Sequence, residues 1–263
     1  MHVLVAGGTG RLGRLVVAEL VERGHQVRVL SRQLRPTPFS QQGVPVARGD
    51  LASGEGITAA VAGVHAVVDA TNAGRDARRV MVSGTRGLLE AASRAGAHHV
   101  VGVGIVGAEA LARLVPYYRV KLDQEQVLAN SGVPWSALRA TQFHDFLAGT
   151  IAGLGRLPVL AAPAIRYQPV DRGEVAGALV DAVEAGPAGR LPDFAGPEAL
   201  LLADFVRLWS AGQGRSRPTL TVPLPGRLGR RLREGALCNL DRAVGRIRFQ
   251  EWATRQVRTE SHV

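Results

Sequence analysis

Lysine and cysteine are almost absent from this chain. Only one of its 32 basic residues (Lys+Arg) is a lysine, so 31 are arginine. The single cysteine, Cys238, excludes an intramolecular disulfide and is typical of a reducing compartment. No apolar run reaches the roughly 18 residues that span a bilayer. No charged region precedes the apolar run that begins after His2. We therefore expect a cytoplasmic chain with neither a membrane span nor a signal peptide.

The net charge of +10 is unevenly distributed. Residues 201–263 hold 12 arginines and 5 acidic residues, which gives +7 of the total. Such a segment could attract nucleic acid, an acidic partner or a phosphorylated ligand. However, no aromatic residues interleave the arginines as a stacking platform for bases requires. We therefore favour a solvated surface over a nucleic-acid site, and we expect the dense run at 226–235 to form an amphipathic helical turn.

The chain of 263 residues is 46% hydrophobic, enough for a large core. Short β-branched runs alternate with longer helical patterns. Strands are predicted at 2–7, 26–32, 44–51, 65–71, 98–107 and 134–140, and helices at 11–24, 56–63, 75–95 and 116–131. The first helix should bury Leu12, Leu15, Val16 and Leu20. This alternation predicts an α/β fold with a doubly wound parallel sheet, whose ligands bind where the strands end.

The pattern becomes less regular after residue 140. We expect a strand, a turn and a helix within 165–186, a helix at 197–212 and an extended stretch at 218–228. No linker is evident. The prediction is a nucleotide-binding core at 1–140 with a substrate-covering region at 141–263, packed together as a single structural unit.

A glycine-rich loop follows the first predicted strand. In "AGGTGRLGR", Gly7, Gly10 and Gly13 have GxxGxxG spacing. The first glycine allows a sharp turn, the second allows close approach of a pyrophosphate, and the third allows helix and strand to pack closely. The position between a strand and a helix favours a dinucleotide site, with phosphates at the positive end of the helix.

The end of the second strand predicts which dinucleotide binds. A site for NAD usually carries Asp or Glu there, but this chain has Ser31 and Arg32, with Arg11 and Arg35 as further candidates. A hydroxyl and a guanidinium suit a 2′-phosphate, which favours NADP(H). The alternative is that Arg32 is one surface arginine among many. The predicted cofactor-binding residues are Gly7, Thr9, Gly10, Arg11, Leu12, Gly13, Ser31, Arg32, Asp50, Leu51, Ala70, Thr71, Asn72 and Lys121.

The single lysine, Lys121, follows Tyr117 by four residues. At this spacing two side chains share one face of a helix. A nearby ammonium stabilises a phenolate, so we expect Lys121 to lower the pKa of Tyr117 and to let it exchange protons near neutrality. A compact amine with three donors also fits ribose hydroxyls better than a guanidinium does. Tyr117 and Lys121 are therefore the predicted catalytic residues.

With these motifs the chain resembles the atypical short-chain dehydrogenase/reductases, within the NmrA-like, NAD(P)H-binding branch. The resemblance covers about residues 1–180 and rests on "VAGGTGRLGR", "GDL", "VGIVGAE", "PYYRVKLDQEQVLANSGVPWSALRATQFHDF" and "YQPVDRGEVA". It implies a Rossmann fold, NADP(H), Tyr117 as acid/base and Lys121 on the nicotinamide ribose. It also implies that Thr141, Gln142 and Phe143 face the nicotinamide and the substrate.

One position departs from the family pattern. The family's fifth strand commonly carries a serine that donates to the reacting carbonyl, whereas this chain has Gly104. Tyr118, Gln142 or His144 could replace that donor, although a tyrosine at 118 is by default a packing residue and a histidine at 144 a surface or capping residue. The predicted substrate residues are Gly104, Tyr118, Gln142, Phe143 and His144.

The expected function is that of an NADPH-dependent oxidoreductase acting on a carbonyl, quinone or conjugated double bond of a small apolar substrate. Two alternatives remain open. One is a non-catalytic regulator that senses NADP(H), favoured by Gly104 and the basic segment. The other is a redox-neutral epimerase or cyclase of secondary metabolism. No metal site is predicted, and the sequence leaves open whether the chain is a monomer or a homo-oligomer.

Overall fold

The computed structural model describes residues 1–33, 39, 43–154, 159–213 and 218–260, and for 257–260 the backbone alone. The chain divides into two compact units. Unit 1 comprises Met1–Gly104, Val115–Leu138 and Val175–Leu191, and unit 2 comprises Ile105–Leu114, Arg139–Glu174 and Pro192–Val263. The units interleave along the chain, because residues 175–191 belong with the N-terminal segment. The boundary at residue 140 and the packing as a single unit stay predictions.

A seven-stranded parallel sheet in the order β3-β2-β1-β4-β5-β6-β9 confirms the predicted fold class. Its strands are β1 His2–Ala6, β2 Gln26–Ser31, β3 Val46–Arg48, β4 Ala66–Asp69, β5 His99–Ile105, β6 Trp135–Ala140 and β9 Gly189–Arg190. The third strand is shorter than the predicted 44–51. The chain turns after it, where the Asp50 backbone N–H donates to the carbonyl of Glu55.

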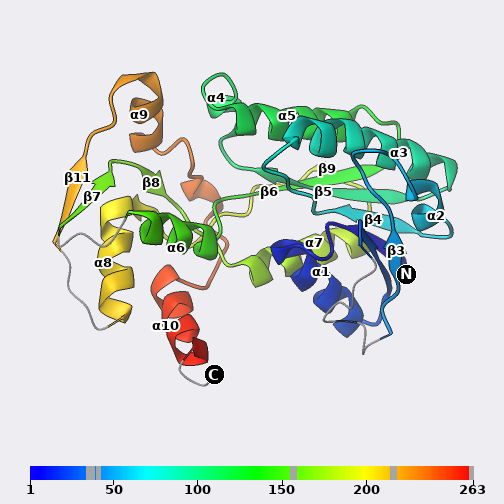
Figure 1. Cartoon of the computed structure of the whole chain (residues 1–263), viewed down its shortest axis with the longest axis horizontal. Coiled ribbons are helices and arrows are strands. Elements are labelled where there is room, and N and C mark those ends of the chain that lie inside the picture. The colour runs from blue at the N-terminus through cyan, green and yellow to red at the C-terminus, as the bar shows by residue number, and fades with distance from the viewer. Residues whose placement is uncertain (34–38, 40–42, 155–158, 214–217, 261–263) are drawn as a thin grey trace. The chain divides into compact units, whose positions relative to one another are not determined.

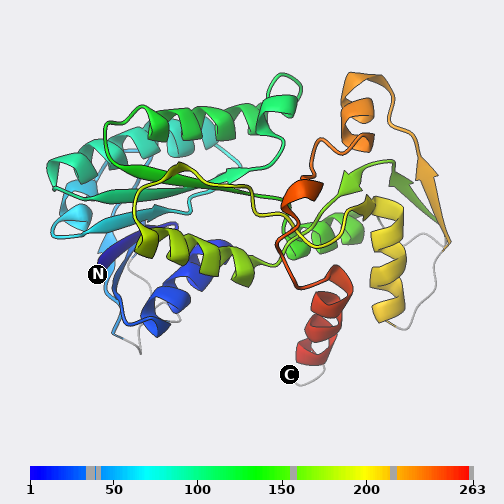
Figure 2. The ribbon, with the colours of Figure 1, turned by 180° about the vertical axis from the view of Figure 1, so that it is seen from behind.

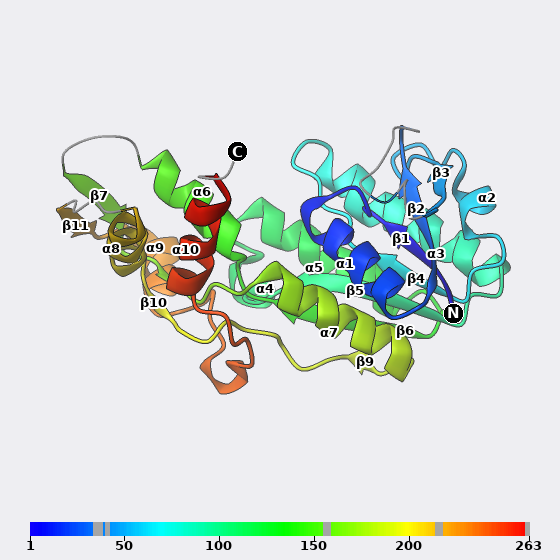
Figure 3. The same cartoon turned by 90° about the horizontal axis from the view of Figure 1, so that it is seen from below.

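Helices cover both faces of this sheet, α1 and α7 on one face and η2, α3 and α5 on the other (Figures 1 and 3). Their bounds are α1 Arg11–Glu22, α2 Ile57–Val61, the π-helical turn η2 Arg79–Ser83, α3 Gly84–Arg94, α5 Pro116–Ala129 and α7 Arg172–Ala185. On one face, Arg23 at the end of α1 forms ion pairs with Asp181 and Glu184 of α7, at 2.7 and 2.8 Å. The predicted helix at 75–95 is correct for 79–94, although its first turn is π-helical.

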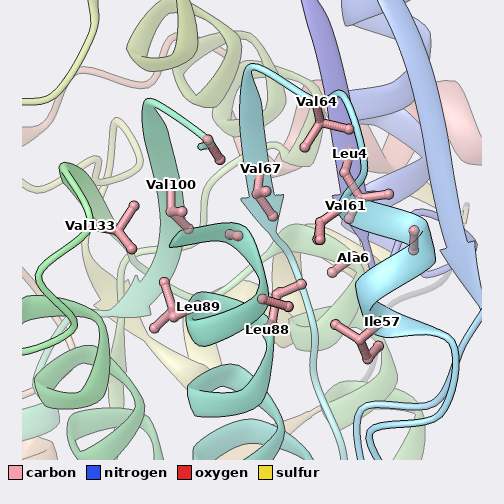
Figure 4. Packing of buried hydrophobic residues seen from close by; sticks show 14 of the residues in the cluster. Leu4, Ala6, Ile57, Val61, Val64, Val67, Leu88, Leu89, Val100 and Val133 are labelled. Atoms are coloured by element: carbon pink, nitrogen blue, oxygen red, sulfur yellow. The ribbon is translucent and has the colours of Figure 1, made fainter. Parts of the chain in front are cut away.

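The core of unit 1 lies between the sheet and the helices α2 and α3 (Figure 4). Leu4, Val67 and Val100 of three neighbouring strands pack against Leu88 and Leu89 of α3. Each fully buried side chain of this size stabilises the fold by about 1.5–3 kcal/mol.

On the opposite face, α1 buries Leu12, Val16 and Leu20 as predicted. The prediction for Leu15 is wrong, since this side chain is 39% exposed. Val17 is buried in its place, so the buried stripe is rotated toward Gly13 and Val17.

Unit 2 contains two small sheets and several helices. Its elements are α4 Ala108–Leu111, α6 His144–Gly153, β7 Leu160–Pro163, β8 Arg166–Tyr167, β10 Leu200–Leu201, α8 Leu202–Gly212, β11 Thr219–Val222, α9 Gly226–Arg233, the 3-10 turn η3 Leu240–Arg242 and α10 Phe249–Glu260. β7 pairs with β11 and β8 with β10. α8 packs beside the β7–β11 pair (Figure 2).

Several details after residue 140 differ from the prediction. The helix expected at 197–212 begins at Leu202, because Leu200 and Leu201 pair with β8. The helix α9 confirms the amphipathic turn expected at 226–235 and begins inside the stretch expected to be extended. Within the described part of the chain, no helix combines the length and apolarity needed to cross a bilayer.

Candidate functional site

The carboxyl ends of the central strands bring the predicted cofactor residues of unit 1 to one edge of the sheet. Ala6, the last residue of β1, lies in register with Leu30 of β2 and Asp69 of β4. The segments that follow, Gly7–Gly10, Ser31–Arg32 and Ala70–Asn72, therefore leave the sheet side by side. This edge is where ligands bind in parallel α/β sheets.

The glycine turn has the geometry expected at Gly7 and Gly13, while the approach of a pyrophosphate to Gly10 stays a prediction. Gly7 has φ +78°, and a Cβ there would lie 2.8 Å from the Ala70 carbonyl oxygen. The Gly10 N–H closes the turn on the Gly7 carbonyl at 2.8 Å. A Cβ on Gly13 would lie 2.1 Å from that same oxygen, so α1 approaches the turn too closely for any side chain at this position.

The start of α1 fits a phosphate group. Gly10 is the N-cap residue, with an extended backbone and no side-chain cap. The first N–H groups of a helix lack intrahelical partners and carry a partial positive charge. Thr9, Gly10 and Arg11 are exposed around them. Leu12, also predicted at this site, is buried under the helix.

At the end of β2, the side chain of Ser31 is hydrogen-bonded within the turn, whereas that of Arg32 faces solvent. The Ser31 hydroxyl donates to the Gln33 carbonyl at 2.9 Å, which shapes the turn. Arg32 is exposed. Arg35, a further candidate, lies outside the described residues. Two more predicted cofactor residues, Asp50 and Leu51, lie in the turn after β3. Asp50 accepts from the Ala52 N–H at 2.9 Å, and Leu51 packs against the core.

Tyr117 lies in the first turn of α5, and its hydroxyl donates to Asn72 Oδ1 at 3.2 Å. This bond joins α5 to the segment after β4. Burial raises the pKa of Tyr117 above its usual value. The predicted lowering of this pKa by Lys121 is therefore wrong for the structure as it stands. The neighbouring Tyr118 packs edge-on against the Tyr117 ring, with 6.0 Å between ring centres.

Lys121 is one turn further along α5 and is only 6% exposed. Its ammonium donates to the Val103 carbonyl at 2.8 Å and to Gln124 Oε1 at 2.9 Å. Burial lowers the pKa of Lys121 to about 8, while the negative charges of Asp69 and Glu125 raise it. Val103 precedes Gly104, where the family resemblance predicted a serine, so the amine lies near the end of β5.

A buried polar cluster behind Lys121 was not predicted from the sequence. Gln124 Nε2 donates to Asp69 Oδ2 and to the Thr85 hydroxyl oxygen, both at 3.2 Å. Thr71, predicted to bind cofactor, donates to Asp69 through its hydroxyl. The only signal in the sequence is the spacing of Gln124, three residues after Lys121 on the same helix.

The remaining predicted substrate residues lie in unit 2. Gln142 Nε2 donates to the Leu237 carbonyl at 3.2 Å. The Phe143 ring lies 4.7 Å below the guanidinium of Arg172. His144 is 1% exposed, contacts the Ile247 carbonyl through Nε2 at 2.9 Å and packs against Phe249. Because His144 is a core residue, the surface alternative for it is wrong, and burial lowers its pKa. Its role toward a substrate stays a prediction.

Among the described residues of unit 1, hollows occur beside Gly104 and beside α3. One of about 10 Å³ adjoins Gly104 and the Gln124 cluster and is too small for a substrate. A hollow of about 390 Å³ opens between η2–α3 and α5, but none of the predicted site residues lines it. Within the described residues, no group of three or more His, Cys, Asp or Glu side chains is placed to hold a metal ion.

Comparisons with known proteins place the chain among NAD(P)H-binding proteins. A family model described as NAD(P)H-binding matches residues 7–185. A (4-alkanoyl-5-oxo-2,5-dihydrofuran-3-yl)methyl phosphate reductase from Streptomyces griseus is 30% identical over 221 residues, which cover 81% of this chain and 74% of the relative. A photosystem II assembly factor Ycf39 from Trieres chinensis is 33% identical over 61% of this chain. The chain spans about half the length of such Ycf39 relatives.

Among solved structures, an NADPH complex of the quinone oxidoreductase QOR2 from Escherichia coli covers 97% of this chain and 99% of its own, with a TM-score of 0.79. Its sequence identity is 18%, so this likeness concerns the fold alone. The matched residues 7–185 include the glycine turn, the Asn72–Tyr117 pair and Lys121. On this evidence, the chain belongs to the NAD(P)H-binding family, as its resemblance to the NmrA-like branch of the short-chain dehydrogenase/reductases predicted.

Proposed function

We propose that this chain is an NADPH-dependent oxidoreductase that reduces a carbonyl, quinone or conjugated double bond of a small apolar substrate. The observation that carries the proposal is the placement of two groups on α5. The Tyr117 phenol meets Asn72 after β4, and the Lys121 ammonium meets Val103 at the end of β5. Both are therefore at the edge of the sheet where the glycine turn would hold the dinucleotide.

Because its pKa is raised, the Tyr117 phenol carries the proton that a reduction consumes. When bound, the reduced nicotinamide supplies the hydride. The phenol is protonated at neutral pH, so it can donate a proton to the substrate oxygen that gains negative charge. Asn72 accepts a hydrogen bond from this phenol and thereby orients it. Donation of the proton to substrate requires the phenol to exchange this bond for one to the substrate oxygen.

Lys121 has a donor to spare for the cofactor. An ammonium has three donors. Within the described residues two of them bond to Val103 and Gln124. The third is available to a ribose hydroxyl, and the compact amine fits a buried position where a planar guanidinium would need more space.

The preference for NADPH over NADH is supported by the end of β2. Arg32 is exposed there, and Ser31 provides no carboxylate to accept from a ribose 2′-hydroxyl. The relatives support the reaction class. The Streptomyces relative is named as a reductase of an oxo-dihydrofuran phosphate, and the Escherichia coli structure as an NADPH-dependent quinone oxidoreductase.

The variant Tyr117→Phe tests the proposed proton donor. A panel of quinones, aldehydes, ketones and enones first identifies a compound that the wild type reduces, through loss of NADPH absorbance. We expect Tyr117→Phe to lower kcat for that compound by about 10²–10⁴-fold, the usual contribution of a general acid, while the Kd of NADPH stays unchanged. Tyr167→Phe, a buried tyrosine of unit 2, is the matched control. Unchanged turnover in Tyr117→Phe would rule out the assigned role.

One observation favours a second function, that of a regulator that senses NADP(H) without turnover. Gly104 stands where the family carries a serine donor, and loss of such a donor costs about 10²–10³-fold in rate. The same panel separates the two functions. A chain that binds NADPH tightly and consumes it with no compound in the panel would favour the regulator.

A further inference from the structure

A chain of buried polar side chains connects β4 to the amine of Lys121. Asp69, Thr85 and Gln124 are 3%, 2% and 6% exposed. Asp69 Oδ1 accepts from the Thr71 N–H at 3.1 Å and from the Thr71 hydroxyl, while Oδ2 accepts from the Thr85 hydroxyl at 2.7 Å and from Gln124. Every one of these contacts is a donor aimed at the carboxylate, which matches the acceptor sites of an ionised group.

The position of Gln124 in this chain allows only one orientation of its amide. The ammonium of Lys121 can only donate, so it must face the amide oxygen. The ionised carboxylate of Asp69 can only accept, so it must face the amide nitrogen. The distances of 2.9 Å and 3.2 Å agree with this assignment. The Gln124 amide therefore links the carboxylate of Asp69 on β4 to the amine of Lys121 on α5, and the position of one constrains the other.

Stability does not explain such a cluster. Burying an ammonium is costly, and well-packed apolar side chains of similar volume often stabilise a fold more than a buried charge does. An amine whose pKa has fallen to about 8 is also close to losing its proton at physiological pH. Groups of this kind concentrate at functional sites. The cluster is thus better explained by what it does for Lys121.

We propose that Gln124 and Asp69 are positioning residues: through this hydrogen-bond chain they keep Lys121 protonated and aim its remaining donor at the cofactor ribose. The inference deepens the proposed function and rests on the role given there to Lys121. Gln124 acts by holding the amine directly. Asp69 acts through Gln124 and through its negative charge.

Several charged and polar groups near Lys121 influence the pKa that a titration of its amine would measure. On α5 this group is Glu125, whose charge raises the pKa of Lys121. β4 contributes Asp69. β5 contributes the Val103 carbonyl, and α3 contributes the neutral hydroxyl of Thr85. Arg78 of the segment before η2 is bonded to Asp123 on α5, at 2.6 Å.

The test uses the single lysine of the chain. Protein labelled with ¹⁵N and ¹³C in lysine gives a single Nζ signal, and its titration by NMR without cofactor measures the pKa of Lys121 directly. We expect Asp69→Asn to lower this pKa by roughly one unit, because an opposite charge nearby favours the ammonium. Gln124→Met should lower it as well, since the amide acceptor of the ammonium is lost.

Asp123→Asn is the matched control. It makes the same Asp-to-Asn change on α5, the helix of Lys121, at a carboxylate that pairs with Arg78 and Arg119. Its lysine titration should match the wild type. An unfolded variant is recognised because its lysine titrates near 10.4. If Asp69→Asn does not fold, Gln124→Met carries the test.

An unchanged lysine titration in Gln124→Met, or in a folded Asp69→Asn, overturns the inference. Failure of the proposed function would be seen elsewhere, as a Lys121→Met variant that binds NADPH as tightly as the wild type at pH 7.

Discussion

At the scale of single residues, the two cations of the candidate site differ in their surroundings. Lys121 is buried and bonded to Val103 and Gln124, whereas Arg32 is exposed at the end of β2. A buried amine can hold a neutral ribose hydroxyl in a fixed position. An exposed guanidinium suits a doubly charged phosphate, which it can contact while remaining partly hydrated.

The variant Arg32→Ala tests the cofactor preference. Because a hydrogen bond to a charged group contributes about 1.5–3 kcal/mol, we expect the Kd of NADPH to rise by about 10–100-fold. The Kd of NADH should change little, since NADH lacks the 2′-phosphate. Arg94→Ala, an exposed arginine at the end of α3, is the control. Equal losses for both nucleotides would contradict the phosphate contact. The measurement is a fluorescence titration with each nucleotide.

The sequence predicted that Tyr117 and Lys121 lie on one helix, and α5 contains both, because local spacing alone determines such a placement. It could not predict that Gln124 meets Asp69, since 55 positions separate them and the contact exists only once β4 and α5 are packed. The direction of the Tyr117 pKa was missed for a similar reason. That direction depends on burial, and burial is a property of the folded chain.

At the scale of elements, the turn between β1 and α1 is the most tightly constrained part of the site. The oxygen of Gly7 accepts from the Gly10 N–H and also lies 2.1 Å from the position that a Cβ on Gly13 would take. The turn thereby holds the start of α1 close to the end of β1. Both the proposed phosphate site and the packing of α1 on the sheet depend on this approach.

Two glycine-to-alanine variants distinguish the effect of this close contact from the effect of helix propensity. Gly13→Ala would place a Cβ 2.1 Å from the Gly7 oxygen, so α1 must shift. We expect it to destabilise the fold by about 1–3 kcal/mol and to weaken NADPH binding. Gly87→Ala, in the interior of α3 with nothing within 4 Å of its Cβ position, should stabilise the fold by about 0.5–1 kcal/mol.

Urea unfolding with and without NADPH measures both effects. A Gly13→Ala variant with wild-type stability and NADPH affinity would show that the close approach is not required.

Elements were predicted well where one period governs a long segment. Through residue 140 every expected strand and helix is present, with β3 shortened by the turn at Asp50. After that point α6 and α10 were missed. The helix α6 carries apolar residues on several faces, so its pattern lacks a clear period, and α10 lies in the arginine-rich segment. The packing of His144 against Phe249 joins these two helices across more than 100 positions, which no local pattern reveals.

At the scale of the whole molecule, the candidate site and the family match fall largely on the same residues. The residues matched by the NAD(P)H-binding model, 7–185, include the cofactor residues of unit 1 and the predicted substrate residues at 142–144. Much of unit 2 lies beyond this match, including the basic segment at 201–263. The family pattern therefore says little about this part of unit 2. A substrate class cannot be read from the sequence there.

The composition of the whole chain makes possible the most direct test of whether Lys121 contacts the cofactor. With 31 arginines and a single lysine, a lysine label reports on Lys121 alone. NADPH is added stepwise to the labelled wild type at pH 7, and binding is followed in parallel by NADPH fluorescence. We predict that the lysine side-chain signal shifts in step with saturation, because the ammonium bonds to the ribose. A signal that stays in place while NADPH saturates the protein would contradict the account.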